Sequence, residues 1–82
     1  MDELLGHHRA RLEEAETVVR NSPGLTCWEA TLRLSWSRDW EEIKGYMRRA
    51  AVGETLAHLV YLESRGRIRS EGTEPARWFP RD

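Results

Sequence analysis

The sequence predicts a small α+β domain that is mainly helical and carries one β-hairpin. Three stretches repeat apolar residues every three or four positions, which is the spacing of an amphipathic helix. The final stretch, from Arg67 onward, instead alternates polar and apolar residues around turn-forming residues. The 82 residues, 39% hydrophobic and 33% charged, suit one soluble globular domain. They are too few for a two-lobed enzyme, a barrel or a dinucleotide-binding fold.

The first helix is predicted over residues 2–20. Its apolar stripe consists of Leu5, His8, Leu12, Ala15 and Val19. The run Asn21-Ser22-Pro23-Gly24 places consecutive helix-breaking residues directly after this segment. We therefore expect the helix to end there.

A second, shorter helix is predicted over residues 27–34. Thr26 is a favourable N-cap, and Glu29 three residues later completes a capping box, in which each side chain binds the backbone N–H of the other. The pair Asp39 and Glu42 repeats this spacing. A helical turn is therefore expected to restart near Trp40.

The third helix is predicted over residues 46–65, after a break or kink at Gly45. Its apolar side is expected to hold Met47, Ala51, Thr55, Leu59 and Leu62, broadened by Val52 and Leu56. Gly66 stands where a C-terminal cap is expected.

The tail has the pattern of a hairpin, with strands at residues 67–70 and 76–79 around a turn at 71–75. Helices followed by a hairpin are the layout of a winged helix, here with a three-helix core and a two-stranded wing. An isolated hairpin is marginal in water, so we expect Ile68 and Trp78 to pack into the helical core. With no linker or repeat, residues 1–82 are expected to form a single domain.

Net charge and cysteine content restrict the compartments and partners that we expect for this chain. The formal net charge is −1, so the chain lacks the basic excess typical of nucleic-acid binders. Cys27 is the only cysteine, which excludes an internal disulfide and favours a reducing compartment. The chain opens with Met1-Asp2-Glu3 and has no long apolar run, so we expect no signal peptide, no membrane contact and a cytoplasmic location.

Histidines give two candidate constellations, both of which we interpret as non-catalytic. His7 and His8 are adjacent on a helix, so their side chains diverge by about 100° and do not readily share one metal ion. Glu54 and His58 share a helix face, but no nucleophile, metal motif or phosphate loop accompanies them. We therefore expect no catalytic, metal or cofactor-binding residue in this chain, and we interpret the second pair as a surface or interdomain contact.

Tryptophan is abundant for so short a chain, at positions 28, 36, 40 and 78. Such residues most often enlarge a small core, but exposed ones mark protein contacts. A protein-interaction module or a small dimer is therefore one hypothesis. The oligomeric state stays open at this point.

Four arginines flank the predicted wing: Arg65, Arg67, Arg69 and Arg77. They are the candidate nucleic-acid contacts of an alternative hypothesis, a stand-alone DNA-binding winged-helix regulator. The stretch 53–63 of the third helix, however, has two acids and no lysine or arginine, where base readout favours Arg, Asn and Gln. We therefore consider nucleic acid an unlikely partner.

An ordered set of motifs resembles a known family. The set comprises His7-His8-Arg9-Ala10-Arg11-Leu12-Glu13, Thr26-x-x-Glu29, Trp36-Ser37-Arg38-x-Trp40, Met47-Arg48-Arg49-Ala50-Ala51, Gly53-Glu54-Thr55-Leu56-Ala57-His58-Leu59, Leu62 and Gly66-Arg67. Taken in order along nearly the whole chain, these resemble the C-terminal winged-helix domain of metallo-β-lactamase-fold hydrolases.

The resemblance implies a longer parent protein that hydrolyses esters, thioesters or phosphodiesters with one or two zinc-type metal ions. The metal ligands of that family lie in an N-terminal domain with a His-x-His-x-Asp-His motif, and none is carried over to this chain. The expected function is that of a non-catalytic accessory domain. It would pack on the catalytic domain through the third helix and the tryptophan region and help to shape the substrate site. The candidate interface or substrate-proximal residues are His7, His8, Arg9, Glu54 and His58.

Overall fold

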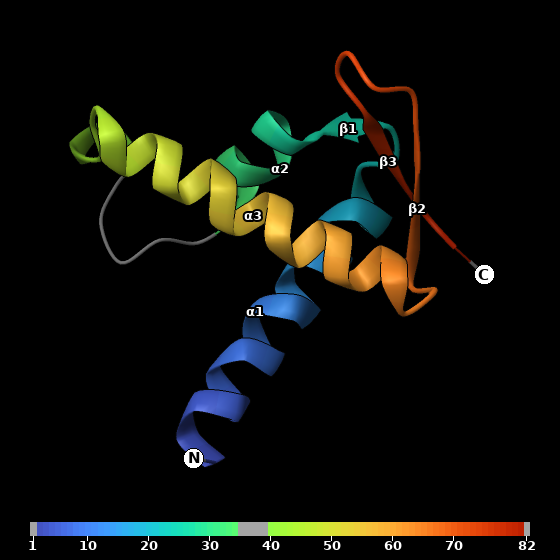
Figure 1. Ribbon diagram of the computed structural model, residues 1–82, viewed down its shortest axis with the longest axis horizontal. Helices are drawn as coiled ribbons and strands as arrows, with labels where there is room; N and C mark the ends of the chain where they lie inside the picture. The colour runs from blue at the N-terminus through green and yellow to red at the C-terminus, as the bar shows by residue number, and fades with distance from the viewer. Residues whose placement is uncertain (1, 35–39, 82) are drawn as a thin grey trace.

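A computed structural model describes the backbone of residues 2–34 and 40–81 and the side chains of residues 9–34 and 41–81. In this described part the molecule is mainly helical, with three α-helices and one small antiparallel sheet, which confirms the predicted α+β class (Figure 1). The elements, in chain order, are α1 (Asp2–Asn21), β1 (Leu25–Thr26), α2 (Cys27–Arg33), the 3-10 turn η1 (Trp40–Glu42), α3 (Tyr46–Ser64), β2 (Ile68–Glu71) and β3 (Arg77–Pro80).

The helix ends follow the capping chemistry that the sequence predicts. At the start of α2, the Glu29 backbone N–H donates to the Thr26 hydroxyl over 3.2 Å, and the Thr26 N–H donates to the Glu29 carboxylate over 2.8 Å. At the end of α3, Gly66 adopts a φ of +74°. Its N–H donates to the Glu63 carbonyl, and the Arg67 N–H donates to the Leu62 carbonyl. This pair of bonds is a Schellman motif, which closes the helix and turns the chain into β2.

The sheet has one strand more than the predicted two-stranded wing. Leu25 pairs with Trp78 and Thr26 pairs with Arg77, so the strand order is β1-β3-β2 with both neighbours antiparallel. The additional strand is two residues long and ends where α2 begins, so it has no alternation of its own. Its pairing attaches the hairpin to the link between α1 and α2.

The core lies where the helices meet the sheet. Ile68 is fully buried and Trp78 is 3% exposed, which confirms that the hairpin packs into the helices. The buried cluster consists of Ala15, Val19, Leu25, Ala30, Leu34, Leu59, Leu62, Ile68 and Trp78.

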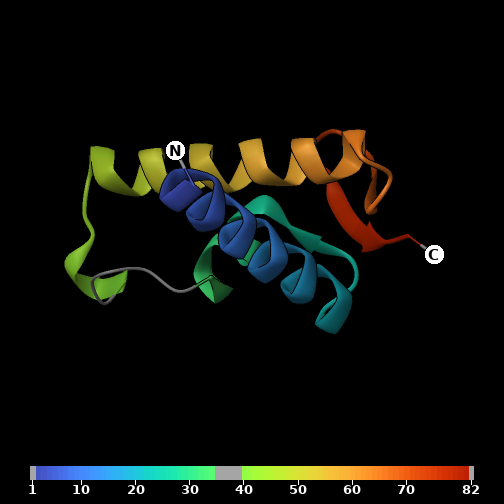
Figure 2. The ribbon, with the colours of Figure 1, turned by 90° about the horizontal axis from the view of Figure 1, so that it is seen from below.

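Two residues expected on the buried side of α3 are exposed instead. Met47 and Leu56 are 42% and 44% exposed, whereas Ala51, Thr55 and Leu59 are buried as predicted. The buried stripe of α3 is therefore narrower than the apolar pattern suggests, because apolar residues continue around to the other side of the helix. Figure 2 shows α3 along one edge of the molecule, with α2 and most of α1 and the sheet on one side of it.

Candidate functional site

A charged cluster links α1 to α3. The Arg11 guanidinium donates to the Glu14 carboxylate over 2.8 Å, and its Nε lies 4.0 Å from a carboxylate oxygen of Glu54. The Arg11 side chain is largely covered, whereas Glu54 is exposed. Two residues of the cluster, Arg11 and Glu14, were not among the predicted site residues. Their spacing of three on one helix is the signal in the sequence that could have identified them.

His58 follows Glu54 by one turn of α3 and contacts its backbone. Its Nδ1 lies 2.6 Å from the Glu54 backbone carbonyl oxygen. Because a carbonyl oxygen only accepts, Nδ1 carries the proton in this contact. This contact orients the imidazole against the backbone of its own helix. This arrangement fits the interpretation of the pair as a surface contact.

The remaining predicted interface residues lie on the N-terminal half of α1. Arg9 is exposed. The backbone of His7 and His8 is helical, but their side chains lie outside the described residues. Across residues 9–34 and 41–81, no group of three or more His, Cys, Asp or Glu side chains is placed to hold a metal ion.

The single cysteine is placed to pack rather than to react. Cys27 is half-buried between α2 and α3, and its Sγ lies 3.6 Å from the Val52 carbonyl oxygen. Burial raises the pKa of its thiol, which outweighs the hydrogen bond that it shares with Thr31. A raised pKa keeps the thiol protonated, and the protonated form is a poor nucleophile and a poor metal ligand.

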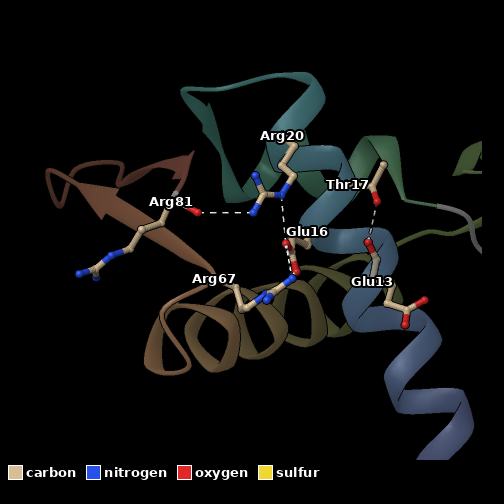
Figure 3. A network of polar contacts seen from close by, with 6 residues as sticks. All are labelled: Glu13, Glu16, Thr17, Arg20, Arg67 and Arg81. Atoms are coloured by element: carbon tan, nitrogen blue, oxygen red, sulfur yellow. Dashed lines mark hydrogen bonds and ion pairs between the residues drawn. The ribbon is translucent and has the colours of Figure 1, made fainter.

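Three of the four wing arginines make contacts within the domain. Arg67 donates two parallel bonds to the Glu16 carboxylate, over 3.0 and 3.1 Å (Figure 3). Arg77 donates to the Gly24 carbonyl over 2.9 Å. Arg69 lies 3.3 Å from the Glu71 carboxylate and stacks over the Phe79 ring at 4.5 Å. Arg65 is exposed. The carboxylates of Glu16 and Glu71 offset part of the positive charge around the β2–β3 hairpin.

The outward side of α3 is apolar along most of its length. Tyr46, Leu56, Val60 and Tyr61 are exposed by 80%, 44%, 49% and 50%. The small residues Ala50, Gly53 and Ala57 are exposed between them. We call these seven residues the outer face of α3. By contrast, the exposed positions of α1 from residue 9 onward are mostly polar: Arg9, Ala10, Glu13, Thr17, Arg20 and Asn21. A helix that is apolar on both sides is typical of one that is covered on both sides.

The tryptophans divide between core and surface. Trp78 belongs to the core, whereas Trp28 on α2 is 46% exposed beside Leu32, which is exposed to a similar degree. Trp36 and the Trp40 side chain lie outside the described residues. The predicted tryptophan surface is therefore represented in the structure by Trp28 alone among the described side chains.

Comparison with known proteins finds no matching family model, no matching curated protein and no matching solved structure. Among the described helices, none combines the length and the apolar character that crossing a membrane requires.

Proposed function

We propose that this chain is a winged-helix accessory domain that binds protein rather than nucleic acid. The partner is the N-terminal catalytic domain of a metallo-β-lactamase-fold hydrolase in the same polypeptide. The order helix, strand, helix, helix, strand, strand, with the first strand beside the last, supports the winged-helix assignment. The family assignment rests on the motif resemblance.

The observation that carries the proposal is the chemistry of α3. In a DNA-binding winged helix, the third helix enters the major groove and presents side chains that bond base edges. Here the outward positions hold Tyr46, Leu56 and Val60, with Gly53 and Ala57 between them, and Arg49 is the one described basic residue beside them. Apolar and aromatic side chains of this kind are typical of protein interfaces.

The edge formed by α1 and α3 is the proposed contact with the catalytic domain. The resemblance places that domain directly before α1, so His7, His8 and Arg9 lie nearest to it in the chain. Arg11, which lies on another side of α1 from Arg9, joins that helix to Glu54 of α3 and continues the charged surface there. Charged residues close to the point where two domains join suit an interdomain contact, because such contacts are more polar than obligate interfaces. In this position the domain would cover one side of the substrate site, while the metal ions of the catalytic domain activate water.

The experiment that tests this proposal uses the longer polypeptide. The coding sequence upstream of Met1 should contain a His-x-His-x-Asp-His motif. In the longer protein, hydrogen exchange at residues 9–11 should slow relative to the 82-residue chain, and Arg9→Glu should restore fast exchange. Arg33→Glu, at an exposed position of α2, is the matched control. Metal-dependent hydrolysis by the purified 82-residue chain alone would contradict the proposal.

DNA binding is the second candidate function, because the same order of elements occurs in DNA-binding winged helices. A titration of the chain with duplex DNA at low and high salt separates the two candidates. Phosphate contacts release counterions, so a DNA-binding domain loses affinity steeply, by roughly 10³-fold or more between 50 and 200 mM salt. We expect only weak binding without a steep salt slope, since three wing arginines are engaged within the domain.

A further inference from the structure

Gly53 is unexplained by the domain taken alone. It lies in the interior of α3, where glycine is less favourable than alanine. Its position is exposed, and a Cβ added there meets no atom within 4 Å. It has no positive φ that would require glycine. A helical glycine in the middle of an apolar face allows the backbone of a second helix to approach closely.

We propose that the outer face of α3 binds the same face of a second copy of this chain, with the two helices antiparallel. The large and small residues of the face are complementary in that arrangement. A twofold axis beside Leu56 and Ala57 places Val60 of each copy opposite Gly53 of the other. The same axis brings Tyr61 over the small residues Ala57 and Ala50. Each copy then presents the same surface to the other, as an isologous interface requires.

Charge selects the antiparallel direction. Arg49, Leu56 and Glu63 are seven residues apart and lie on one stripe of α3. Antiparallel pairing about Leu56 brings Arg49 of each copy beside Glu63 of the other, whereas parallel pairing would bring like charges together. Arg49 is exposed, and no described residue pairs with it. Glu63 accepts a bond from Ser70 at Oε2, which leaves its Oε1 without a partner among the described side chains.

This dimer goes beyond the proposed function. It assigns a second copy of the chain to the outer face of α3, whose apolar character favours a protein partner over DNA, and it leaves the catalytic domain on another part of the surface. The contact with a catalytic domain is placed at the start of α1 and at the Arg11–Glu54 pair, whereas the dimer is centred on Gly53, Leu56 and Val60 of the outer face. Figure 2 shows α3 along the edge of the molecule, with α2 on one side of it. The parent hydrolase would then be a dimer joined through its accessory domains. The two proposals can fail independently of each other.

Sedimentation of the 82-residue chain tests the dimer. Between about 1 µM and about 1 mM, a range that spans affinities from tight to weak, the mass should rise from monomer to dimer. Gly53→Gln should raise the dissociation constant at least about tenfold, because the new side chain fills the space that Val60 of the partner copy occupies. The variant should remain folded, since the position is open within the domain. Ala10→Gln, exposed on α1, is the matched control and should leave the dimer intact.

Cross-linking tests the register of the two α3 helices in the dimer separately. A mixture of Gly53→Cys and Val60→Cys chains should form disulfide-linked heterodimers under mild oxidation, whereas Gly53→Cys alone should form none. A chain that is monomeric throughout the concentration range overturns the proposal. So does a dimer that Gly53→Gln leaves unchanged, or cross-linking of Gly53→Cys to itself, which would indicate parallel helices.

Discussion

At the scale of single residues, Glu16 connects three segments that are distant in sequence. Its carboxylate accepts two bonds from Arg67 and one from Arg20 over 3.0 Å, and Arg20 in turn donates to the Arg81 carbonyl (Figure 3). The bonds from Arg67 are the main cause of the lowered pKa of Glu16, and Arg20 adds to them against the opposing effect of burial. This one carboxylate therefore joins α1 to the turn before β2 and, through Arg20, to the C-terminal segment.

The lowered pKa makes a pH-dependent prediction. A carboxyl group whose folded pKa lies below its ordinary value of 4.5 stabilises the fold fully above that value, and this stabilisation is lost as the pH falls through the folded pKa. Glu16→Gln should therefore lower the free energy of unfolding by about 1 kcal/mol at pH 7, a small value because the two guanidinium groups are largely exposed. Below the folded pKa the two proteins should be equally stable.

Urea denaturation over a pH series measures this difference. The matched control is Glu13→Gln, an exposed acid on the same helix, which should change little at any pH. A deficit of Glu16→Gln that persists unchanged at low pH would show that the ion pair is not its cause.

The sequence does not predict which side chains pair when they lie far apart along the chain. Glu54 and His58 share a face by helical periodicity, and that spacing is visible in the sequence. Arg67 and Glu16, by contrast, are 51 residues apart. Their contact depends on how α1 crosses the end of α3, which no local pattern encodes. The arginines of the predicted wing were therefore interpretable as phosphate contacts until the fold placed acids beside Arg67 and Arg69.

At the scale of elements, the sequence predicts what is periodic or capped. The capping box of α2, the glycine that ends α3 and the hairpin all follow from local chemistry and are confirmed. The strand β1 escaped prediction because two residues cannot show alternation. The predicted width of the buried stripe on α3 was wrong for a different reason. Hydrophobicity alone does not distinguish the side that faces the domain's own core from a side that faces a partner.

Two glycines of the α3 region are predicted to respond in opposite directions to alanine. Gly66 holds a φ of +74°, a region that costs an L-residue roughly 1–2 kcal/mol, so Gly66→Ala should destabilise the domain by about 1 kcal/mol. Gly53 is helical and open, so Gly53→Ala should stabilise the monomer by about 0.5–1 kcal/mol.

Thermal unfolding at low micromolar concentration compares the two glycine variants without the influence of a dimer. Each variant serves as the other's control, because both replace a hydrogen by a methyl group in or beside the same helix. Destabilisation by Gly53→Ala at this concentration would mean that its position is crowded within the monomer.

At the scale of the whole molecule, the domain is flat, with extents of 34 × 33 × 19 Å. The sheet has only two short edge strands around β3, and such a sheet is marginal unless it packs against helices. Ile68 from β2 and Trp78 from β3 provide that packing, in one cluster with Val19 of α1 and Leu59 of α3. We therefore expect the β2–β3 hairpin and the helices to unfold as one cooperative unit.

Cooperative unfolding predicts the effect of truncating a side chain in the core that the hairpin and the helices share. Ile68→Ala should lower the free energy of unfolding of the entire domain by about 2–5 kcal/mol, the usual range for truncating a buried isoleucine, rather than release the wing alone. Far-ultraviolet circular dichroism, which reports the helices, and near-ultraviolet circular dichroism, to which the buried Trp78 contributes, should shift together. Leu32→Ala, on the exposed side of α2, should change stability far less and serves as the control. A near-ultraviolet signal that melts before the helices in Ile68→Ala would show instead that the wing folds as a separate unit and that its core contacts contribute little to the helices.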